Sequence, residues 1–94
     1  MVTLLSELDY LVGLVVKSVA GRDKNRFYVI IKICGNRVYI ADGKVRKLGC
    51  LKSKNLIHIK KTNKVIDVAL FETDRGLRRV LHDYNYGDYG EKTN

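Results

Sequence analysis

The chain has 94 residues and a formal net charge of +8, with 18 Lys and Arg against 10 Asp and Glu. A single domain of this size removes only about 60–65% of its unfolded surface from water, which leaves no room for an elaborate substrate cavity. Residues 13–64 contain 14 Lys and Arg but only two acidic residues. Such a concentrated field attracts polyanions, so nucleic acid or an acidic protein surface is the leading partner class. A solvated basic surface without a partner is the alternative.

The apolar stretch at residues 4–16 is interrupted by polar residues, and no basic segment precedes it. We therefore expect neither a signal peptide nor a membrane span. Cys34 and Cys50 lack Cys-x-x-Cys spacing, which predicts free thiols in a cytoplasmic protein and makes a disulfide the weaker alternative. A zinc site that adds His58 and His82 is disfavoured because the spacings match no compact zinc motif, and we expect no cofactor.

Residues 1–10 form a lead-in whose conformation the sequence does not decide, and residues 11–71 have the pattern of a small barrel. Strands are expected over 11–19 and 26–34, because both stretches are rich in β-branched and aromatic residues. Further strands are expected over residues 37–41, 44–48, 56–60 and 65–70, with turns at 35–36, 42–43 and 62–63 and a lysine-bearing loop at 49–55. Five or six short antiparallel strands predict a mostly β protein with a small closed barrel, which leaves no exposed sheet edges.

The segment 72–84 changes to helical periodicity, which predicts a short C-terminal helix over residues 74–84. Thr73 is positioned to cap this helix, and its apolar stripe should pack on the barrel. The stripe consists of Leu77, Val80, Leu81 and Tyr84, and the opposite face of Arg75, Arg78, Arg79 and His82. That basic face is equally compatible with a solvated surface and with a contact to RNA, in addition to the candidate RNA-binding residues named below. Residues 85–94 are expected to form a flexible tail.

Several short segments resemble one known family. Gly13-Leu14-Val15-Val16, followed by Gly21-Arg22-Asp23-Lys24 and a hydrophobic strand, resembles the KOW motif, a strand-loop-strand unit of SH3-like barrels. Residues 55–59 and 62–68 are similar to the closing segment of the large-subunit ribosomal protein family numbered fourteen in archaea and eukaryotes, and short bacterial KOW-domain RNA-binding proteins share that segment. The hairpin Ile40-Ala41-Asp42-Gly43 with Val45-Arg46-Lys47 is similar to theirs as well. The resemblance spans residues 11–84 and implies an SH3-like barrel that binds ribosomal or other structured RNA.

Phosphate recognition requires long cationic side chains on a rigid support, together with backbone that can approach closely. Gly21 lacks a Cβ, and Asn25, which stands where many relatives have glycine, tolerates a positive φ. Asp23 would repel phosphate, so we expect it to accept backbone hydrogen bonds or to pair with Arg22 or Arg26. The candidate RNA-binding residues are Lys17, Gly21, Arg22, Lys24, Arg26, Lys44, Arg46, Lys47, Lys52 and Lys54. We expect the two basic turns to converge into a single cationic ridge.

Phe27, Tyr28 and Tyr39 are more compatible with core packing than with stacking on bases, and His58 with a hydrogen-bonded structural role. The sequence has no nucleophile elbow, phosphate loop or paired carboxylates in an apolar segment, so we expect no enzyme. The favoured hypothesis is a monomeric, non-catalytic, ribosomal or ribosome-associated protein that contacts the backbone of structured RNA, with ribosomal proteins as further partners. The alternative is a KOW protein-docking module of the transcription or translation machinery.

Overall fold

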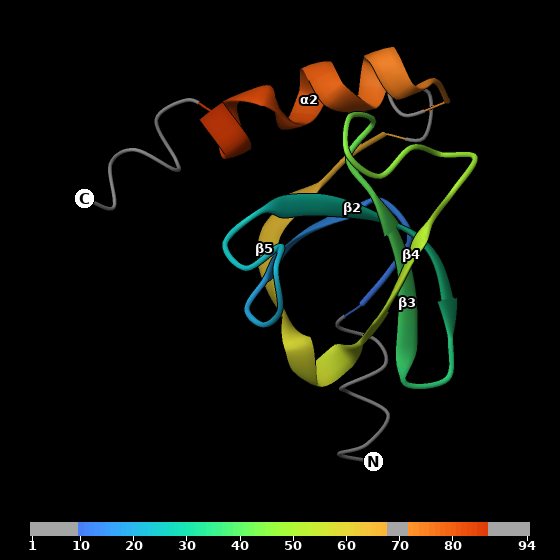
Figure 1. Cartoon of the computed structure of the whole chain (residues 1–94). Coiled ribbons are helices and arrows are strands. Elements are labelled where there is room, and N and C mark those ends of the chain that lie inside the picture. Colours follow the sequence, from blue (N-terminus) through green and yellow to red (C-terminus); the bar gives the residue numbers. More distant parts are fainter. Residues whose placement is uncertain (1–9, 68–71, 87–94) are drawn as a thin grey trace.

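The computed structural model describes residues 10–67 and 72–86, and helix α2 lies across a strongly curved sheet (Figure 1). Five antiparallel strands form this sheet in the order β4-β3-β2-β1-β5. The elements are β1 (Leu14–Ser18), β2 (Phe27–Cys34), β3 (Arg37–Ala41), β4 (Lys52–Asn55), the 3-10 turn η1 (Leu56–His58), β5 (Ile59–Val65) and α2 (Asp74–Tyr86). Most of the expected lead-in, the end of the last expected strand and most of the expected tail lie outside the described residues. The mostly β fold that the sequence predicts, a small barrel-like sheet of antiparallel strands with one C-terminal helix, is confirmed.

Alternating side chains divide the core into two layers on opposite faces of the sheet. The inner layer fills the barrel and contains Leu14, Val16, Tyr28, Ile30, Val38, Ile40 and Ile59. The outer layer lies between the sheet and α2 and contains Val15, Val29, Ala41, Ile66, Leu77 and Leu81. The two leucines of α2 are fully buried, and each contributes about 1.5–3 kcal/mol by leaving water. The predicted packing of the helix on the barrel is therefore confirmed.

Polar contacts fix α2 at both ends. Thr73 accepts a hydrogen bond from the Gly76 amide at 3.0 Å, which confirms the predicted cap. The Asp74 carboxylate accepts one from the Leu48 amide at 2.6 Å and so attaches the loop after β3 to the start of the helix. At the other end, the Asn85 side chain accepts from the Phe27 amide at 2.8 Å and donates to the Phe27 carbonyl at 3.2 Å. These bonds help to explain why α2 continues to Tyr86, past the predicted end and into the expected tail.

Residues 44–48 are not a strand, although their alternating pattern predicts one. One carboxylate oxygen of Asp42 accepts the amides of Lys44 and Arg46 at 2.9 and 2.8 Å, which curls the chain into a loop. Side chains of this type compete with strand ladders for backbone donors. The partner of β3 is instead β4, within the stretch expected to be a loop, where Tyr39 pairs with Ser53.

The start and middle of the last strand also differ from the expectation. Residues 56–58 form η1, because the Asn55 side chain accepts the Ile57 amide at 3.1 Å and begins a 3-10 turn. Thr62 and Asn63 lie within β5 instead of forming a turn. Between the pairs Leu14–Val65 and Val16–Lys61 the register of β1 and β5 shifts, which marks a bulge.

Candidate nucleic-acid interface

The loop between β1 and β2, residues 19–26, is the centre of the predicted site and is tied at its base. The Ser18 amide donates to the Arg26 carbonyl at 2.9 Å, and the Asn25 amide donates to the Ser18 carbonyl at 2.7 Å. Gly21 and Asn25 have positive φ values of 88° and 76°. Asn25 therefore takes the backbone conformation expected of it, one that few residues other than glycine adopt readily.

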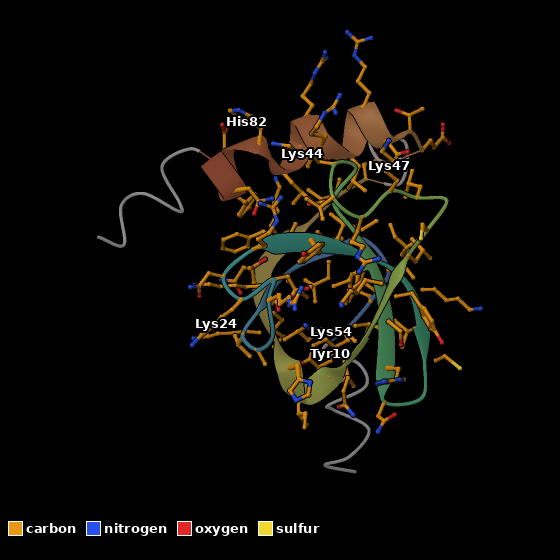
Figure 2. All side chains as sticks on the ribbon, in the orientation of Figure 1. Tyr10, Lys24, Lys44, Lys47, Lys54 and His82 are labelled. Carbon is orange, nitrogen blue, oxygen red and sulfur yellow. The ribbon has the colours of Figure 1, made fainter. Side chains whose placement is uncertain are left out.

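Asp23 folds back from this loop toward the barrel and does not pair with Arg22. Its carboxylate accepts hydrogen bonds from Lys54 Nζ at 2.8 Å, from Ser18 Oγ at 2.8 Å and from Tyr28 Oη at 3.3 Å. Lys54 Nζ also donates to the Ala20 carbonyl at 3.0 Å. Figure 2 shows Lys54 within the ring of strands, and its side chain is only 9% exposed. Lys54, a candidate RNA-binding residue, thus holds the loop from inside the barrel.

The charges in this network alter two pKa values. Burial favours the protonated form of Asp23, but hydrogen bonds from Lys54 and Ser18 and the charge of Lys54 outweigh it and lower the pKa. Burial, followed by the negative charges of Asp23 and Asp42, raises the pKa of Tyr28 to about 12. Asp23 is therefore ionised and Tyr28 neutral at physiological pH.

Arg26 belongs to a second internal ion pair. Its Nη2 lies 2.8 Å from Oδ2 of Asp42, whose side chain is 1% exposed. Burial opposes ionisation of Asp42, but the hydrogen bonds from Arg26 and from the Arg46 and Lys44 amides lower its pKa. The buried carboxylate thus joins the base of the β1–β2 loop to the loop after β3, and Arg26 has a structural partner there.

Arg22 and Lys24 are exposed on the loop that these ion pairs hold. Lys52 is half-buried on β4, two residues before Lys54, whose Nζ bonds the Ala20 carbonyl of this loop. Arg22, Lys24 and Lys52 are called the loop surface below. This surface presents a guanidinium, which can bind phosphate oxygens in a bidentate manner, and ammonium groups, which act as point charges.

The second basic turn does not join this surface. Figure 2 shows Lys44 and Lys47 beside α2, whereas Lys24 lies well apart from them on the flank of the barrel. The loop after β3 packs closely on α2 at Gly43. A Cβ there would overlap the Asp74 carbonyl oxygen and come within 2.8 Å of the Arg78 amide nitrogen. The expected single ridge is therefore wrong, because close packing on α2 takes the second turn to another face.

Lys44 and Lys47 instead share the side of the molecule that carries the basic face of α2. Arg75, Arg78, Arg79 and His82 are all exposed, and His82 projects away from the barrel in Figure 2. The backbone amide of Arg46 donates a hydrogen bond to Asp42, and the Arg46 side chain is half-buried. We call Lys44, Lys47 and the three arginines the helix surface. It is a second concentration of positive charge.

Lys17 lies in neither surface. Its side chain, 5.8 Å from the Phe27 ring centroid, lines a groove with residues 60–64 and Tyr84. Lys60, Lys61 and Lys64 are not among the predicted site residues, although three lysines within five residues are a visible signal in the sequence. The turn predicted at residues 62–63 would place them on separate elements, whereas they share β5, which lies beside Lys17 of β1.

Of the aromatic residues, Tyr28 is buried in the inner core, and Tyr39 is half-buried with Lys32 Nζ 5.6 Å from its ring centroid. The His58 side chain is exposed, so the expected structural role for it is not seen. Cys34 and Cys50 are both free and exposed. Within residues 10–67 and 72–86, no group of three or more His, Cys, Asp or Glu side chains is arranged to hold a metal ion.

Comparison of the chain with protein-family models and with curated proteins gives no match. In the described part of the chain, no helix has the length and apolar character needed to cross a membrane. The chemistry of the site therefore has to be argued from its own side chains. These are exposed cations on a braced loop, with the carboxylates of Asp23 and Asp42 turned inward and neutralised by internal partners.

Proposed function

We propose that this protein binds structured RNA without catalysis, as a ribosomal or ribosome-associated protein, and that the loop surface is its main contact with the sugar-phosphate backbone. The observation that carries this proposal is the division of charge around the β1–β2 loop. Arg22 and Lys24 are exposed, while Asp23 between them is turned inward onto Lys54. The outer side of the loop is thus cationic, although its sequence alternates in sign.

A braced loop suits phosphate binding because less conformational entropy is lost when the complex forms. The loop's anchors are the positive φ values of Gly21 and Asn25 and the hydrogen bonds of Asp23. Double-stranded RNA is recognised mainly through its shape and its backbone, for which fixed cations at a loop are sufficient. The helix surface supplies a second cationic face for a folded RNA that wraps around the molecule.

The test is binding of duplex or ribosomal RNA as salt is raised from about 50 to about 300 mM, since neutralising about five phosphates gives a log-salt slope of about −4.5 on the duplex scale. Arg22→Glu with Lys24→Glu should weaken binding to all duplex sequences alike and reduce the magnitude of the slope by about two. The matched control is Lys32→Glu with Arg37→Glu. It changes the charge equally, on exposed residues near the opposite end of β2.

Equal losses for the two double variants would show that net charge alone drives binding and would overturn the assignment to the loop surface. A flat salt response would overturn RNA binding itself.

A protein-docking module is the second candidate, favoured by the exposed side chains of Val19 and Ile57. The Val19 amide donates a hydrogen bond to the His58 carbonyl at 2.9 Å. Val19 therefore lies at the same end of the barrel as Ile57, the residue before His58. Partners retained in a pull-down after nuclease treatment would support docking.

A further inference from the structure

A groove on another face of the barrel combines positive charge with aromatic rings. It has a volume of about 620 Å³ and is formed by β1, β2, β5 and the C-terminal part of α2, which come together on the left of Figure 1. Its lining consists of Lys17, Phe27, Lys60, Lys61, Thr62, Asn63, Lys64 and Tyr84. Four of these residues are lysines, although Nζ of Lys61 lies 5.7 Å from the Tyr10 ring centroid, and none of the lining residues within the described chain is acidic.

We infer that this groove binds an unpaired nucleotide of single-stranded RNA, with its phosphates among the lysines and its base against the aromatic rings. The site is separate from the loop surface, and the inference does not depend on duplex binding there. It would give the protein a second mode of contact, with bases that are not paired in a helix.

The first support is an unfavourable pairing of like charges. Lys17 and Lys60 are direct partners across the β1–β5 ladder, where facing cations repel one another. The bulge in β5 then brings Lys64 to the same groove. A bound phosphate would relieve this repulsion, because its negative charge lies between the two cations. Each ammonium group could also donate a charge-assisted hydrogen bond to it, which is roughly twice as strong as a neutral one.

The second support is the geometry of the bulge, which fixes where the lysines project. Thr62 Oγ1 donates to the Val15 carbonyl at 2.7 Å and accepts the Lys64 amide at 3.2 Å. Its hydroxyl therefore fills the irregularity in the ladder and holds the backbone of residues 62–64 against β1. Bulges of this kind redirect side chains and are common beside functional sites. The side chain of Asn63 is exposed at the same edge, and its amide group can donate a hydrogen bond to a base or accept one from it.

The third support is the aromatic part of the groove. The Phe27 and Tyr84 rings lie 5.2 Å apart between centroids at an angle of 48°, and both side chains are half-buried. Asn85 bonds both backbone groups of Phe27, so these rings are held by the end of α2. Single-stranded nucleic acid is bound in this way elsewhere, with cations along the backbone and aromatic rings under the bases. The groove volume falls within the range of about 300–1,000 Å³ that small ligands occupy.

The test uses a fluorescently labelled oligouridine of about eight nucleotides, a length within the usual site size, measured by anisotropy at low salt. An abasic oligomer with the same number of phosphates is the ligand control. If a base stacks in the groove, the abasic oligomer should bind about 5- to 150-fold more weakly, the range expected for one stacked base. Equal binding of the two oligomers would overturn the inference, because charge alone would then explain it.

The variant arm compares Lys60→Gln with Lys64→Gln against Lys32→Gln with Arg37→Gln, two cations that lie in none of the surfaces described above. All four side chains are exposed, so both double variants should fold, which thermal unfolding will confirm. The groove variant should bind oligouridine about tenfold more weakly and lose about 1.4 from the log-salt slope, whereas the control should stay within about threefold. Equal losses in the two variants would overturn the site.

Two further measurements separate this site from its alternatives. The Arg22→Glu, Lys24→Glu variant should keep most of its oligouridine binding while losing duplex binding, so a failure of either site is seen independently. Uridine monophosphate should compete only weakly, because it offers one phosphate instead of several. Competition as strong as that of the oligomer would mean a free nucleotide ligand and would overturn single-stranded RNA as the occupant.

Discussion

Lys54 Nζ lies 2.8 Å from Oδ1 of Asp23, so that a lysine of β4 neutralises the carboxylate of the β1–β2 loop from inside the barrel. The same ammonium group bonds the Ala20 carbonyl at 3.0 Å. Lys54 therefore determines the shape of the loop that presents Arg22 and Lys24, without being exposed itself. A cation that appears in sequence to be a phosphate ligand has a positioning role in the structure.

Replacing Lys54 tests this role. Lys54→Met keeps most of the length of the side chain but leaves a partly buried carboxylate without its strongest donor, which should lower the free energy of unfolding by about 1–3 kcal/mol. Urea denaturation measures the loss, and Lys52→Met, on the same strand but half-buried, should change stability by less than about 0.5 kcal/mol. A cycle with Asp23→Asn should show coupling of about 0.5–3 kcal/mol between residues 23 and 54. Additive effects would contradict the pairing.

The β-branched and aromatic content of β1, β2 and β3 was enough to predict these strands, and the apolar spacing from Leu77 to Tyr84 was enough to predict the helix. These features depend on short-range periodicity, which a sequence displays directly. The loop at residues 44–48, where the pattern predicts a strand, could not be identified from periodicity. It depends on Asp42, whose carboxylate bonds two backbone amides and one guanidinium at the same time.

The candidate site was predictable only in part, for a related reason. The exposed tip with Arg22 and Lys24 follows from the Gly21 turn, which is a local signal. The partners of Asp23 and Arg26 are Lys54 and Asp42, which lie 31 and 16 residues away along the chain. Such partners depend on strand order and register, so periodicity cannot identify them.

The lowered pKa values of Asp23 and Asp42 predict loss of stability in acid. Both carboxylates have a lower pKa when folded than when unfolded, so their contribution is present above the unfolded value of about 4 and is lost as pH falls through the folded values. The free energy of unfolding, measured in urea, should therefore decline from about pH 5 downward. Asp23→Asn should be less stable than the parent at neutral pH and should show a shallower decline. Parallel pH curves for the two proteins would contradict the assignment.

Tyr28 predicts the opposite sensitivity, at alkaline pH. Its pKa is raised to about 12 from 10.0, so its contribution to stability is complete below pH 10 and is lost as pH rises toward 12. In an ultraviolet titration of the folded protein, one of the six tyrosines should ionise at a pH well above the usual value of about 10. Tyr28→Phe should remove this late step. A late step that persists in Tyr28→Phe would assign it to another tyrosine.

The contact between Gly43 and α2 predicts a large effect of a single methyl group. Gly43 has a φ of +79°, and a Cβ there would overlap the Asp74 carbonyl. Gly43→Ala combines backbone strain with steric overlap and should cost about 2–5 kcal/mol. Gly35 is the matched control, because its φ is +62° and nothing lies within 4 Å of the position of its Cβ. Gly35→Ala should therefore cost only about 1–2 kcal/mol. Similar losses in thermal or urea unfolding would show that the overlap is relieved by a small shift of α2.

The hydroxyl of Thr62 predicts a link between the bulge in β5 and the lysine groove. Thr62→Val has nearly the same shape but removes the bonds to the Val15 carbonyl and the Lys64 amide, which should cost about 1–3 kcal/mol in urea denaturation. Because Lys64 is then no longer held in place, oligouridine binding should weaken although no lysine has been changed. Thr62→Ser retains the hydroxyl and should restore most of both properties. A serine variant that behaves like the valine variant would show that the methyl group, and not the hydroxyl, shapes this edge.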